Sequence, residues 1–341
     1  MSSQLSTGSG QLLCRTAMAL AVVAPLGFLA RRRLCSARAV ERLTPGCAEH
    51  RSWMKQMKAF IFDIDGVVYT GSGSIDGAAE ALAALRAAGK TVIFMTNNAT
   101  KSPEDVVAAF AKHGAICSTE EVMTSALVAA DFLKSKDLAG SKVYVVGMNS
   151  LTVALRERAG VFPFGAEEDT GKTRDNMLKD FFPAMDPLPG DVAAVVVGAD
   201  FGFNLYKMAR AANYLRQNPS CLFVATNPDP RALLGSGTII PACGSVVASI
   251  AIAAGRSPDI VCGKPSASLA QHMLRHRGLD PKTTCMVGDR TDTDIEFGRC
   301  VGMQTLFVES GTMSEAEARA AEPCRRPHFI AHSIAVLRDL L

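Results

Sequence analysis

The chain has 341 residues, of which 48% are hydrophobic and 20% are charged, and its formal net charge is +3. This length is typical of about two domains, and the composition can bury a sizeable core, which excludes disorder and fibrous structure for most of the chain. Residues 1–58 carry a net charge of +7, which leaves −4 for the remainder. An acidic body argues against nucleic acid as a partner, because binding to a phosphate backbone needs a basic face.

The first 40 residues contain no Asp or Glu and are rich in Arg and Ser. An apolar run from Thr16 to Ala30 is shorter than the roughly 20 residues that span a bilayer. We therefore predict that residues 1–55 are a targeting leader, cleaved or disordered, for a plastid or a mitochondrion. A loosely membrane-associated helix is the alternative for this segment, and the cytoplasm is the alternative location. No stable membrane association is predicted.

Beyond the leader, apolar runs of strand length alternate with alanine-rich segments of helical pattern. The expected strands are Ala59–Phe62, Thr91–Met95, Val143–Val146, Val192–Val197, Leu222–Ala225, Ile260–Cys262, Thr284–Val287 and Thr305–Val308. The expected helices include Ala78–Ala88, Glu104–Lys112, Leu205–Leu215 and Ala267–Arg277. Short β-branched runs between helices predict an α/β fold with a parallel sheet that is covered on both faces.

The first expected strand is followed by two acidic residues, Asp63 and Asp65, and by Gly66. At a period of two residues both carboxylates point the same way, and ligands of open α/β sheets bind outside the carboxyl ends of the strands. Two adjacent carboxylates repel each other unless a cation lies between them, which favours a hard ion such as Mg²⁺. The alternative is a strand that simply enters an Asp/Gly turn.

The second expected strand ends in Thr96, Asn97 and Asn98. Their hydroxyl, amide and backbone N–H groups are suitable donors to phosphate oxygens. A turn at the asparagines that leads into the next helix at Ser102 explains the same residues equally well.

A later strand ends in Gly263, Lys264 and Pro265, so that a lysine is framed by two residues that restrict the backbone. A positive charge held at a strand end can neutralise a phosphate or hold a carboxylate in place. We predict this role for Lys264.

The last motif places three carboxylates, Asp289, Asp292 and Asp294, between a strand and a helix. So much negative charge is costly without a cation, so we favour a metal site over a helix cap, although Asp292 or Asp294 could serve both purposes.

Taken in order, these motifs resemble those of the haloacid dehalogenase (HAD) superfamily of aspartate-nucleophile phosphatases, over residues 57–338. More narrowly, they resemble the p-nitrophenylphosphatase-like group, which contains phosphoglycolate and pyridoxal phosphate phosphatases. Its members carry a large α/β (C2-type) cap between the second and third motifs. The resemblance implies a HAD-like Rossmannoid core of parallel strands in residues 56–138 and 260–341, interrupted by an inserted α/β cap domain at 139–259.

The resemblance also implies roles for the motif residues. Asp63 would be the nucleophile that forms an aspartyl phosphate, and Asp65 would be the general acid and base. Lys264 would stabilise the charge of the transferring phosphoryl group. The phosphate would be bound by Thr96, Asn97, Asn98 and Lys264.

The same resemblance implies a Mg²⁺ cofactor held by Asp63, the carbonyl of Asp65, and Asp289. Asp294 would lie outside this set, beside the direct ligands or linked to the ion through water. It further implies a small-molecule phosphomonoester as the substrate and a possible homodimer formed through the cap.

Substrate choice depends on the cap. Residues 198–204 align with a segment in which relatives often have a histidine, and this chain has Gly202 there. The segment Thr226 to Asp229 resembles that of phosphoglycolate phosphatases slightly more than that of pyridoxal phosphatases. We therefore expect 2-phosphoglycolate or a similar small phosphometabolite, with p-nitrophenyl phosphate as an artificial substrate. The alternatives are pyridoxal 5′-phosphate or a phosphoprotein.

A hypothesis of a different class is a phospho-accepting regulatory module, because receiver domains also combine acidic residues, a threonine and a lysine on a parallel sheet. A signalling module needs a long-lived phosphoaspartate, whereas Asp65 would hasten its hydrolysis. This second carboxylate and the large insertion favour the enzyme.

Overall fold

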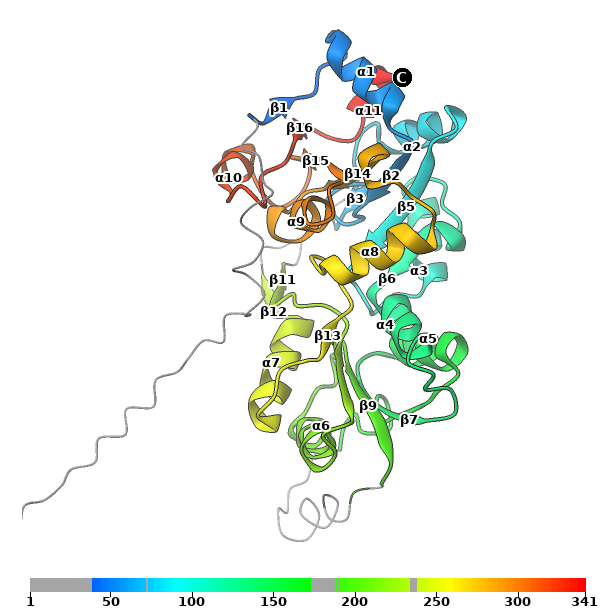
Figure 1. The fold of residues 1–341 in the computed structure, drawn as a ribbon, viewed down its shortest axis with the longest axis vertical. Helices are drawn as coiled ribbons and strands as arrows, with labels where there is room; N and C mark the ends of the chain where they lie inside the picture. Colours follow the sequence, from blue (N-terminus) through cyan, green and yellow to red (C-terminus); the bar gives the residue numbers. More distant parts are fainter. Residues whose placement is uncertain (1–38, 72, 173–184, 186–187, 189, 234–237) are drawn as a thin grey trace, which may run out of the picture. The chain divides into compact units, whose positions relative to one another are not determined.

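The computed structural model describes residues 39–341, with gaps at 72, 173–184, 186–187, 189 and 234–237. Residues 1–38 of the predicted leader lie outside the described residues. The described strands form two parallel sheets and two short antiparallel hairpins (Figure 1). This agrees with the α/β class predicted from the alternation of apolar runs and helical segments.

The first sheet has seven described strands in the order β1-β16-β15-β14-β2-β5-β6, and every pair in it is parallel. In chain order its strands are β1 (Glu41–Arg42), β2 (Ala59–Phe62), β5 (Thr91–Thr96), β6 (Val122–Thr124), β14 (Thr284–Gly288), β15 (Gln304–Val308) and β16 (Phe329–Ala331). The hairpin of β3 (Tyr69–Thr70) and β4 (Gly73–Ser74) follows β2. Strands β2 and β14 are neighbours, so the residues that follow them meet at one edge of the sheet.

The second sheet, which is also parallel, has five described strands in the order β13-β10-β9-β7-β8. Its strands are β7 (Lys142–Val146), β8 (Phe162–Phe164), β9 (Val192–Val197), β10 (Leu222–Ala225) and β13 (Ile260–Val261). The hairpin of β11 (Arg231–Leu233) and β12 (Ile239–Pro241) lies between β10 and β13 in the chain.

Helices follow most of the strands. They are α1 (Ala48–Gln56), α2 (Ala78–Ala87), α3 (Pro103–Lys112), α4 (Ser125–Lys134), α5 (Asn149–Ala159), α6 (Leu205–Gln217), α7 (Cys243–Ala254), α8 (Ala267–His276), α9 (Glu296–Arg299), α10 (Glu315–Ala320) and α11 (Val336–Leu340). Helix α3 begins where the sequence predicts: Ser102 and Asp105 form a reciprocal capping box and Pro103 occupies the first turn.

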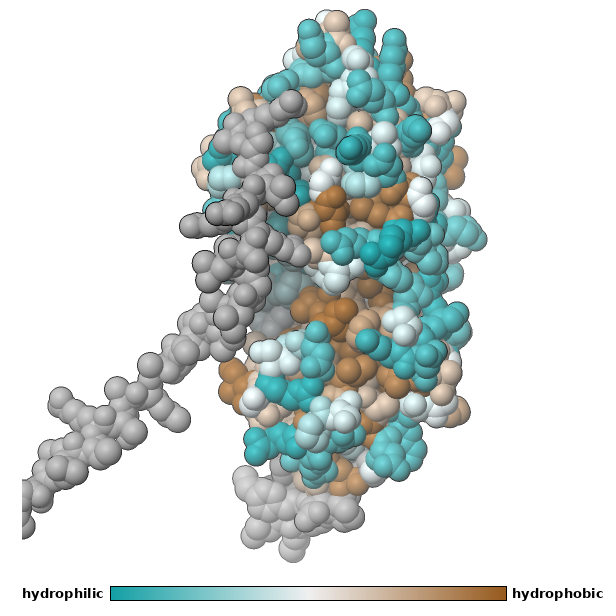
Figure 2. Space-filling view, viewed as in Figure 1, coloured by the Kyte–Doolittle hydropathy of each residue, from teal (hydrophilic) through white to brown (hydrophobic). Residues whose placement is uncertain are grey.

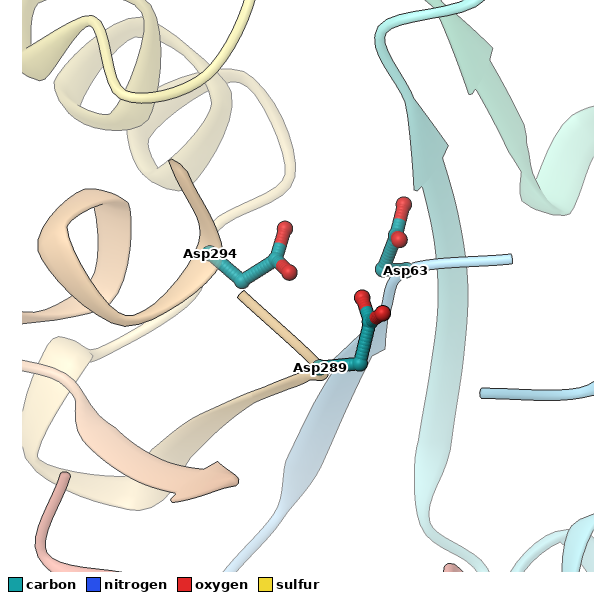
Figure 3. Close-up of side chains that lie close together, drawn as sticks. All are labelled: Asp63, Asp289 and Asp294. Carbon is teal, nitrogen blue, oxygen red and sulfur yellow. The ribbon is translucent and has the colours of Figure 1, made fainter. Parts of the chain in front are cut away.

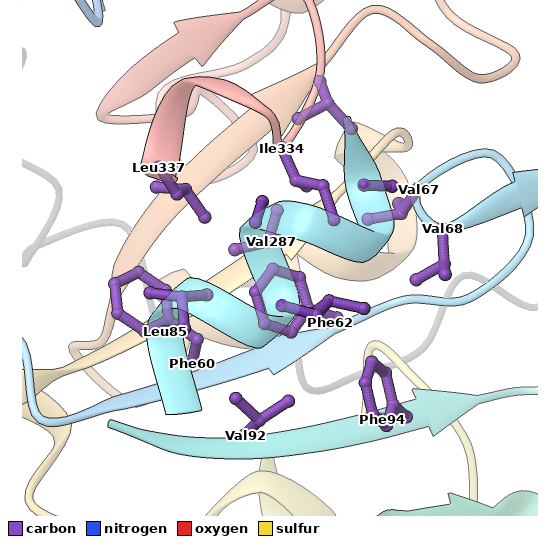
Figure 4. Packing of buried hydrophobic residues seen from close by; sticks show 14 of the residues in the cluster. Phe60, Phe62, Val67, Val68, Leu85, Val92, Phe94, Val287, Ile334 and Leu337 are labelled. Atoms are coloured by element: carbon purple, nitrogen blue, oxygen red, sulfur yellow. The ribbon is translucent and has the colours of Figure 1, made fainter. Parts of the chain in front are cut away.

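The core of the first sheet follows from the two-residue period of its strands. Phe60 and Phe62 face one side, where they pack with Phe94, Val287 and residues of α2 and α11 (Figure 4). Ile61 faces the other side, where it joins a cluster that includes residues of α4, α8 and α9. Both faces of the central strands are therefore buried, as expected of a parallel sheet.

The predicted leader extends too far into the fold. Strand β1 pairs with β16, and helix α1 buries Met54, which is 1% exposed in the core of the first sheet. Strand β1 has only two residues and only two side chains of α1 are fully buried, His50 and Met54. Neither element therefore gives a clear hydrophobic period in the sequence.

The described residues from 39 onward lie in one compact unit, so the predicted limits of the core and the cap remain predictions. The second sheet comprises strands from residues 142–261. Its last strand, β13, pairs with β10 and lies just beyond the predicted end of the cap at residue 259.

Polar and charged side chains cover most of the face in Figure 2, with hydrophobic residues on either side of helix α8. Among the described residues, no helix has the length and the hydropathy needed to cross a membrane.

Candidate active site

Three carboxylates from two neighbouring strand ends converge at one edge of the first sheet. Asp63 follows β2, Asp289 follows β14, and Asp294 lies in the π-helical turn Thr291–Ile295 that leads into α9. One oxygen from each lies within 4.8 Å of the others, and the three side chains lie close together (Figure 3). Asp63 of the first motif is therefore brought together with Asp289 and Asp294 of the last, because β2 and β14 are adjacent and parallel.

Lys264 is buried in the same place. Its Nζ donates to Asp63 Oδ1 at 2.6 Å and to the carbonyl of Met95 at 3.1 Å, and it forms an ion pair with Asp294 Oδ1 at 2.7 Å. The lysine side chain is 2% exposed. The structure thus joins the third motif to the first and the last, although 201 residues separate Lys264 from Asp63.

The cluster carries more negative charge than the lysine can neutralise. Burial, together with the charges of Asp294 and Asp289, raises the pKa of Asp63 well above its usual value, although Lys264 opposes this shift. Burial and the charge of Asp294 raise the pKa of Asp289 to about 6. For Lys264, burial alone would lower the pKa, but Asp294 and Asp63 raise it above its usual value. Three carboxylates facing one ammonium group are the electrostatic setting in which a divalent cation is stabilised.

The donor set fits a hard cation. Asp289 Oδ2 accepts from the backbone N and the Oγ1 of Thr312 at 2.7 and 2.9 Å, which fixes the carboxylate in place. Asp294 Oδ1 is buried and lacks a hydrogen-bond partner other than its ion pair with the lysine. Carboxylate oxygens at this spacing are typical ligands of Mg²⁺ or Ca²⁺, and bonds such as those from Thr312 orient such ligands.

Two glycines let the backbone approach this cluster closely. A Cβ atom on Gly311 would lie 2.0 Å from Asp289 Oδ2, and one on Gly288 would lie 2.2 Å from the Cβ of Asp294. Neither distance is possible for a real side chain, so glycine is required at both positions.

Asp65 occupies a different position from the three clustered carboxylates. Its side chain is exposed and does not belong to the cluster, among the residues that the structure describes. The turn after it closes through a hydrogen bond from Gly66 N to the carbonyl of Tyr69 at 2.8 Å, with Gly66 at a φ of 85°. An exposed carboxylate two residues after Asp63 remains available to substrate and water.

The second motif lies beside Lys264. Asn97 Oδ1 accepts from Lys264 N at 2.8 Å and Asn97 Nδ2 donates to the carbonyl of Lys264 at 3.1 Å. Thr96 is buried, and its Oγ1 accepts from Asn98 N. The side chain of Asn98 accepts from the N and Oγ1 of Thr100, which is the asparagine turn considered from the sequence. The asparagine side chains thus shape the loop, and phosphate binding by this motif remains a prediction.

The interpretation of the last motif as three metal-binding carboxylates is wrong for Asp292, which the metal set implied by the resemblance does not include. Its side chain is 47% exposed and pairs with Arg290, and it does not join Asp63, Asp289 and Asp294 in the cluster. In the π-helical turn Asp294 faces inward whereas Asp292 faces the solvent side. Spacing in the sequence could not distinguish them, because an irregular turn does not follow a helical or strand period.

Three residues that support the site were not predicted from the sequence. Thr312 holds Asp289, Arg290 binds Asp229, and Asn227 Nδ2 donates to the carbonyl of Asn97 at 2.7 Å. The signal available for Thr312 was a Ser-Gly-Thr segment shortly after β15, which ends beside β14. The partners of Arg290 and Asn227 come from distant segments and gave no local signal.

Comparison with known proteins agrees with this geometry. A family model described as haloacid dehalogenase-like hydrolase matches residues 60–160, and one described as HAD-hydrolase-like matches residues 261–337. The chain is 38% identical to phosphoglycolate phosphatase 1A, chloroplastic, of Arabidopsis thaliana, over 82% of this chain and 76% of that protein. It is 35% identical to chronophin of Mus musculus, over 85% of this chain and 94% of that protein.

Among solved structures, a glycerol phosphate phosphatase from Mycobacterium tuberculosis in complex with magnesium is 30% identical, with a TM-score of 0.69. The match covers 84% of this chain and 77% of that chain, and the same protein has been solved with calcium. Both ions are divalent, in agreement with the carboxylate cluster of this chain. The motifs, the fold and the relatives lead to one conclusion: the chain belongs to the haloacid dehalogenase-like hydrolase family and is a phosphatase.

Proposed function

We propose that this phosphatase is Mg²⁺-dependent and hydrolyses small phosphomonoesters through an aspartyl phosphate on Asp63. The observation that supports this most directly is the position of Lys264 Nζ, 2.6 Å from Asp63 Oδ1 and 2.7 Å from Asp294 Oδ1. Such a lysine keeps the attacking carboxylate in one orientation and offsets the charge of a phosphoryl group beside it.

In the first step, a carboxylate oxygen of Asp63 attacks the phosphorus atom, and the bond between phosphorus and the ester oxygen breaks. The carboxyl group of Asp65 gives its proton to the leaving alkoxide. General acid catalysis of this kind contributes about 10²- to 10⁴-fold to a rate. The exposed position of Asp65 supports this role, because the leaving group must depart toward solvent.

In the second step, Asp65 is a carboxylate and takes a proton from a water molecule whose oxygen attacks the phosphorus. The bond between phosphorus and Asp63 breaks, and inorganic phosphate leaves. Both aspartates are then in their starting states, so the cycle is balanced.

The residues that would hold Mg²⁺ are Asp63, the carbonyl of Asp65, and Asp289, with Asp294 beside them. When bound, the ion supplies positive charge that neutralises the phosphoryl oxygens. Thr96, the backbone of Asn97 and Lys264 would hold the phosphoryl group, and Asn98 would keep their loop in shape through its bonds to Thr100.

For the substrate we propose 2-phosphoglycolate or a similar small phosphorylated acid. Two observations support this choice: the similarity to an Arabidopsis phosphoglycolate phosphatase, and the segment Thr226 to Asp229. At Gly202, where relatives often have a histidine, a Cβ atom would lie 2.7 Å from Thr170 Cγ2, so the chain has packed Thr170 into that space. A contact from such a histidine to a larger substrate is therefore missing here.

Burst and turnover measurements on p-nitrophenyl phosphate with Mg²⁺ test the mechanism. We expect continuous turnover in the native chain and its loss in Asp63→Asn. Release of one equivalent of product without turnover would instead support the phospho-accepting module, and full turnover in Asp63→Asn would exclude Asp63 as the nucleophile.

Relative kcat/KM values test the substrate. The panel comprises phosphoglycolate, pyridoxal 5′-phosphate, glycerol 3-phosphate and a phosphotyrosine peptide, and we expect phosphoglycolate to be preferred. A preference for pyridoxal 5′-phosphate of more than about tenfold, or 1.4 kcal/mol, would contradict the proposal.

We further propose that residues 1–38 direct the protein to an organelle, a plastid rather than a mitochondrion. Support comes from the Arg-rich, acid-free composition and from Arabidopsis relatives that are named chloroplastic. A fluorescent fusion of residues 1–55 should enter the organelle, and a fusion that stays in the cytosol would refute this. A homodimer through the cap also remains a proposal, for which light scattering of the purified chain is the test.

A further inference from the structure

Asp229 connects the loop after β10 to two segments of the first sheet. Its Oδ2 accepts from Asn97 Nδ2 at 2.9 Å, and its Oδ1 pairs with Arg290 Nη1 at 3.1 Å. These partners are 132 and 61 residues away in the sequence. The Asp229 side chain is 17% exposed and that of Arg290 is 32% exposed, so the carboxylate that makes both contacts is the more shielded partner of the ion pair.

The first contact leads to Lys264. Both polar atoms of the Asn97 amide bind the backbone of Lys264, and this amide is the group that Asp229 holds. The space around it is full: a Cβ atom on Gly263 would lie 2.7 Å from Asn97 Oδ1 and 2.8 Å from the Cβ of Asn227. Asn97 therefore cannot reorient without moving the segment that carries Lys264.

The second contact leads to the carboxylate cluster. Arg290 directly follows Asp289, and its backbone N donates to Asp294 Oδ2 at 3.1 Å. Its guanidinium group is held by Asp229 on one edge and by Asp292 at 3.1 and 2.9 Å on another. Burial alone would lower the pKa of Arg290, but Asp292 and Asp229 raise it, so the group is charged at neutral pH.

We propose that Asp229 is a positioning residue for phosphoryl transfer. Its single carboxylate bridges the two sides of the active site, the side that carries Lys264 and the side that carries Asp289 and Asp294, and so fixes their separation. Asp229 acts through Asn97 and Arg290 and not on the substrate itself. The inference rests on the roles proposed above for Asp63 and Lys264, because it concerns how the groups around the phosphoryl site are held. Small displacements of such groups have large effects on rate.

Steady-state kinetics on p-nitrophenyl phosphate with Mg²⁺ test this, with kcat expressed per folded molecule from urea unfolding of each variant. Asp229→Ala should lower kcat by about tenfold or more and change KM by less than about threefold, since no substrate contact is removed. Asp229→Asn keeps an acceptor for Asn97 but loses the charge for Arg290. It should therefore match Arg290→Gln, with a loss of about threefold in kcat.

The double variant Asp229→Ala/Arg290→Gln should be no slower than Asp229→Ala, because both changes break the same bridge. Asp131→Asn is the matched control: Asp131 forms a two-bond pair with Arg158 on helices α4 and α5, away from the site. Its kcat should stay within about twofold of the native value.

A kcat within twofold of native in Asp229→Ala, or losses that multiply in the double variant, would overturn the inference. A lower urea midpoint with unchanged kcat per folded molecule would also overturn it, since Asp229 would then only stabilise the fold. These results are distinct from failure of the proposed function, which would appear as a native chain without turnover or as full turnover in Asp63→Asn.

Discussion

Two buried lysines, Lys264 in the active site and Lys207 beside the second sheet, lie in networks that differ in charge. Carboxylates outnumber the cation around Lys264, whereas the buried charges around Lys207 are balanced. Lys264 faces three carboxylates and no other cation among the described residues of the cluster. Lys207 is fully buried against Asp200 at 2.7 Å and donates to Thr170 Oγ1 at 2.8 Å.

The buried charges around Lys207 are balanced, because Asp200 and Asp169 pair with Lys207 and Arg210. Asp169 is 1% exposed and pairs with Arg210 at 2.8 Å, and the half-exposed Lys172 lies at its other oxygen at 2.8 Å. The hydroxyl of Tyr144 donates to Asp169 at 2.9 Å, and the Arg210 guanidinium lies 5.1 Å from the centre of the Tyr144 ring. Every described charge in this network has a partner within the chain. Burial and ion pairing alone therefore do not mark a functional site, whereas an excess of buried negative charge does.

The largest difference between the two networks is expected when each lysine is replaced by methionine. Lys264→Met should lower kcat on p-nitrophenyl phosphate by about 10²-fold or more, because a charge-stabilising group beside the phosphoryl site is lost. Lys207→Met should leave kcat per folded molecule within about threefold of native. It should instead lower the free energy of unfolding by about 3–5 kcal/mol, since Asp200 becomes a buried charge without its partner.

Turnover normalised to the folded fraction, together with urea unfolding, measures both effects. The comparison fails if Lys207→Met loses as much turnover per folded molecule as Lys264→Met does. Equal activity of Lys264→Met and the native chain would remove the lysine from the mechanism.

The charge imbalance also predicts a response to metal. Mg²⁺ at about 100 times its dissociation constant should stabilise the native chain by about 2.7 kcal/mol in urea unfolding. Asp289→Asn should lose most of this shift because a carboxylate ligand is replaced by a neutral amide. Lys172→Met removes a half-exposed partner of Asp169 in the balanced network and should keep the full shift.

Chelation with EDTA should return the native chain to its metal-free midpoint. A shift of equal size in Asp289→Asn would mean that Mg²⁺ binds elsewhere, and a shift lost in Lys172→Met would mean that the two networks are coupled.

The sequence predicted the strands well, because a short apolar run is visible in the order of neighbouring residues. The strands Ala59–Phe62 and Thr284–Val287 were visible as apolar runs, and parallel pairing brings the residues that follow them to one place. That Asp63 and Asp289 act together was implied by the resemblance to the HAD superfamily, which also included Asp294 and not Asp292. Residue spacing alone does not separate Asp292 from Asp294, because the difference lies in an irregular turn.

The balanced network was not predictable in this way. Arg210 and Asp169 are 41 residues apart and Tyr144 lies 25 residues before Asp169, and nothing in the sequence pattern pairs them. The bridge from Asp229 to Asn97 and Arg290 was hidden for the same reason. Contacts between side chains of distant segments depend on how the helices and loops pack against the two sheets, and hydrophobic periodicity does not specify this packing.

The smallest effect that separates the two networks comes from removing one hydroxyl from each. Thr312 Oγ1 donates to Asp289 and the hydroxyl of Tyr144 donates to Asp169, both at 2.9 Å. Tyr144→Phe should lower the free energy of unfolding by about 1 kcal/mol without changing the Mg²⁺ dependence of turnover. Thr312→Val keeps the backbone N–H bond to Asp289. It should raise the Mg²⁺ concentration for half-maximal turnover by about 3- to 10-fold, which is at the lower end of the effect of removing a group that hydrogen-bonds to a metal ligand.

Mg²⁺ titrations of turnover and urea unfolding of both variants measure these changes. If Asp289 is a metal ligand and Asp169 only a structural anion, the two variants must differ in kind: Thr312→Val in metal dependence, Tyr144→Phe in stability. An unchanged Mg²⁺ requirement in Thr312→Val would mean that the orientation of Asp289 does not limit metal binding. A raised requirement in Tyr144→Phe would show that the balanced network also supports the metal site, and the distinction between the two regions would no longer hold.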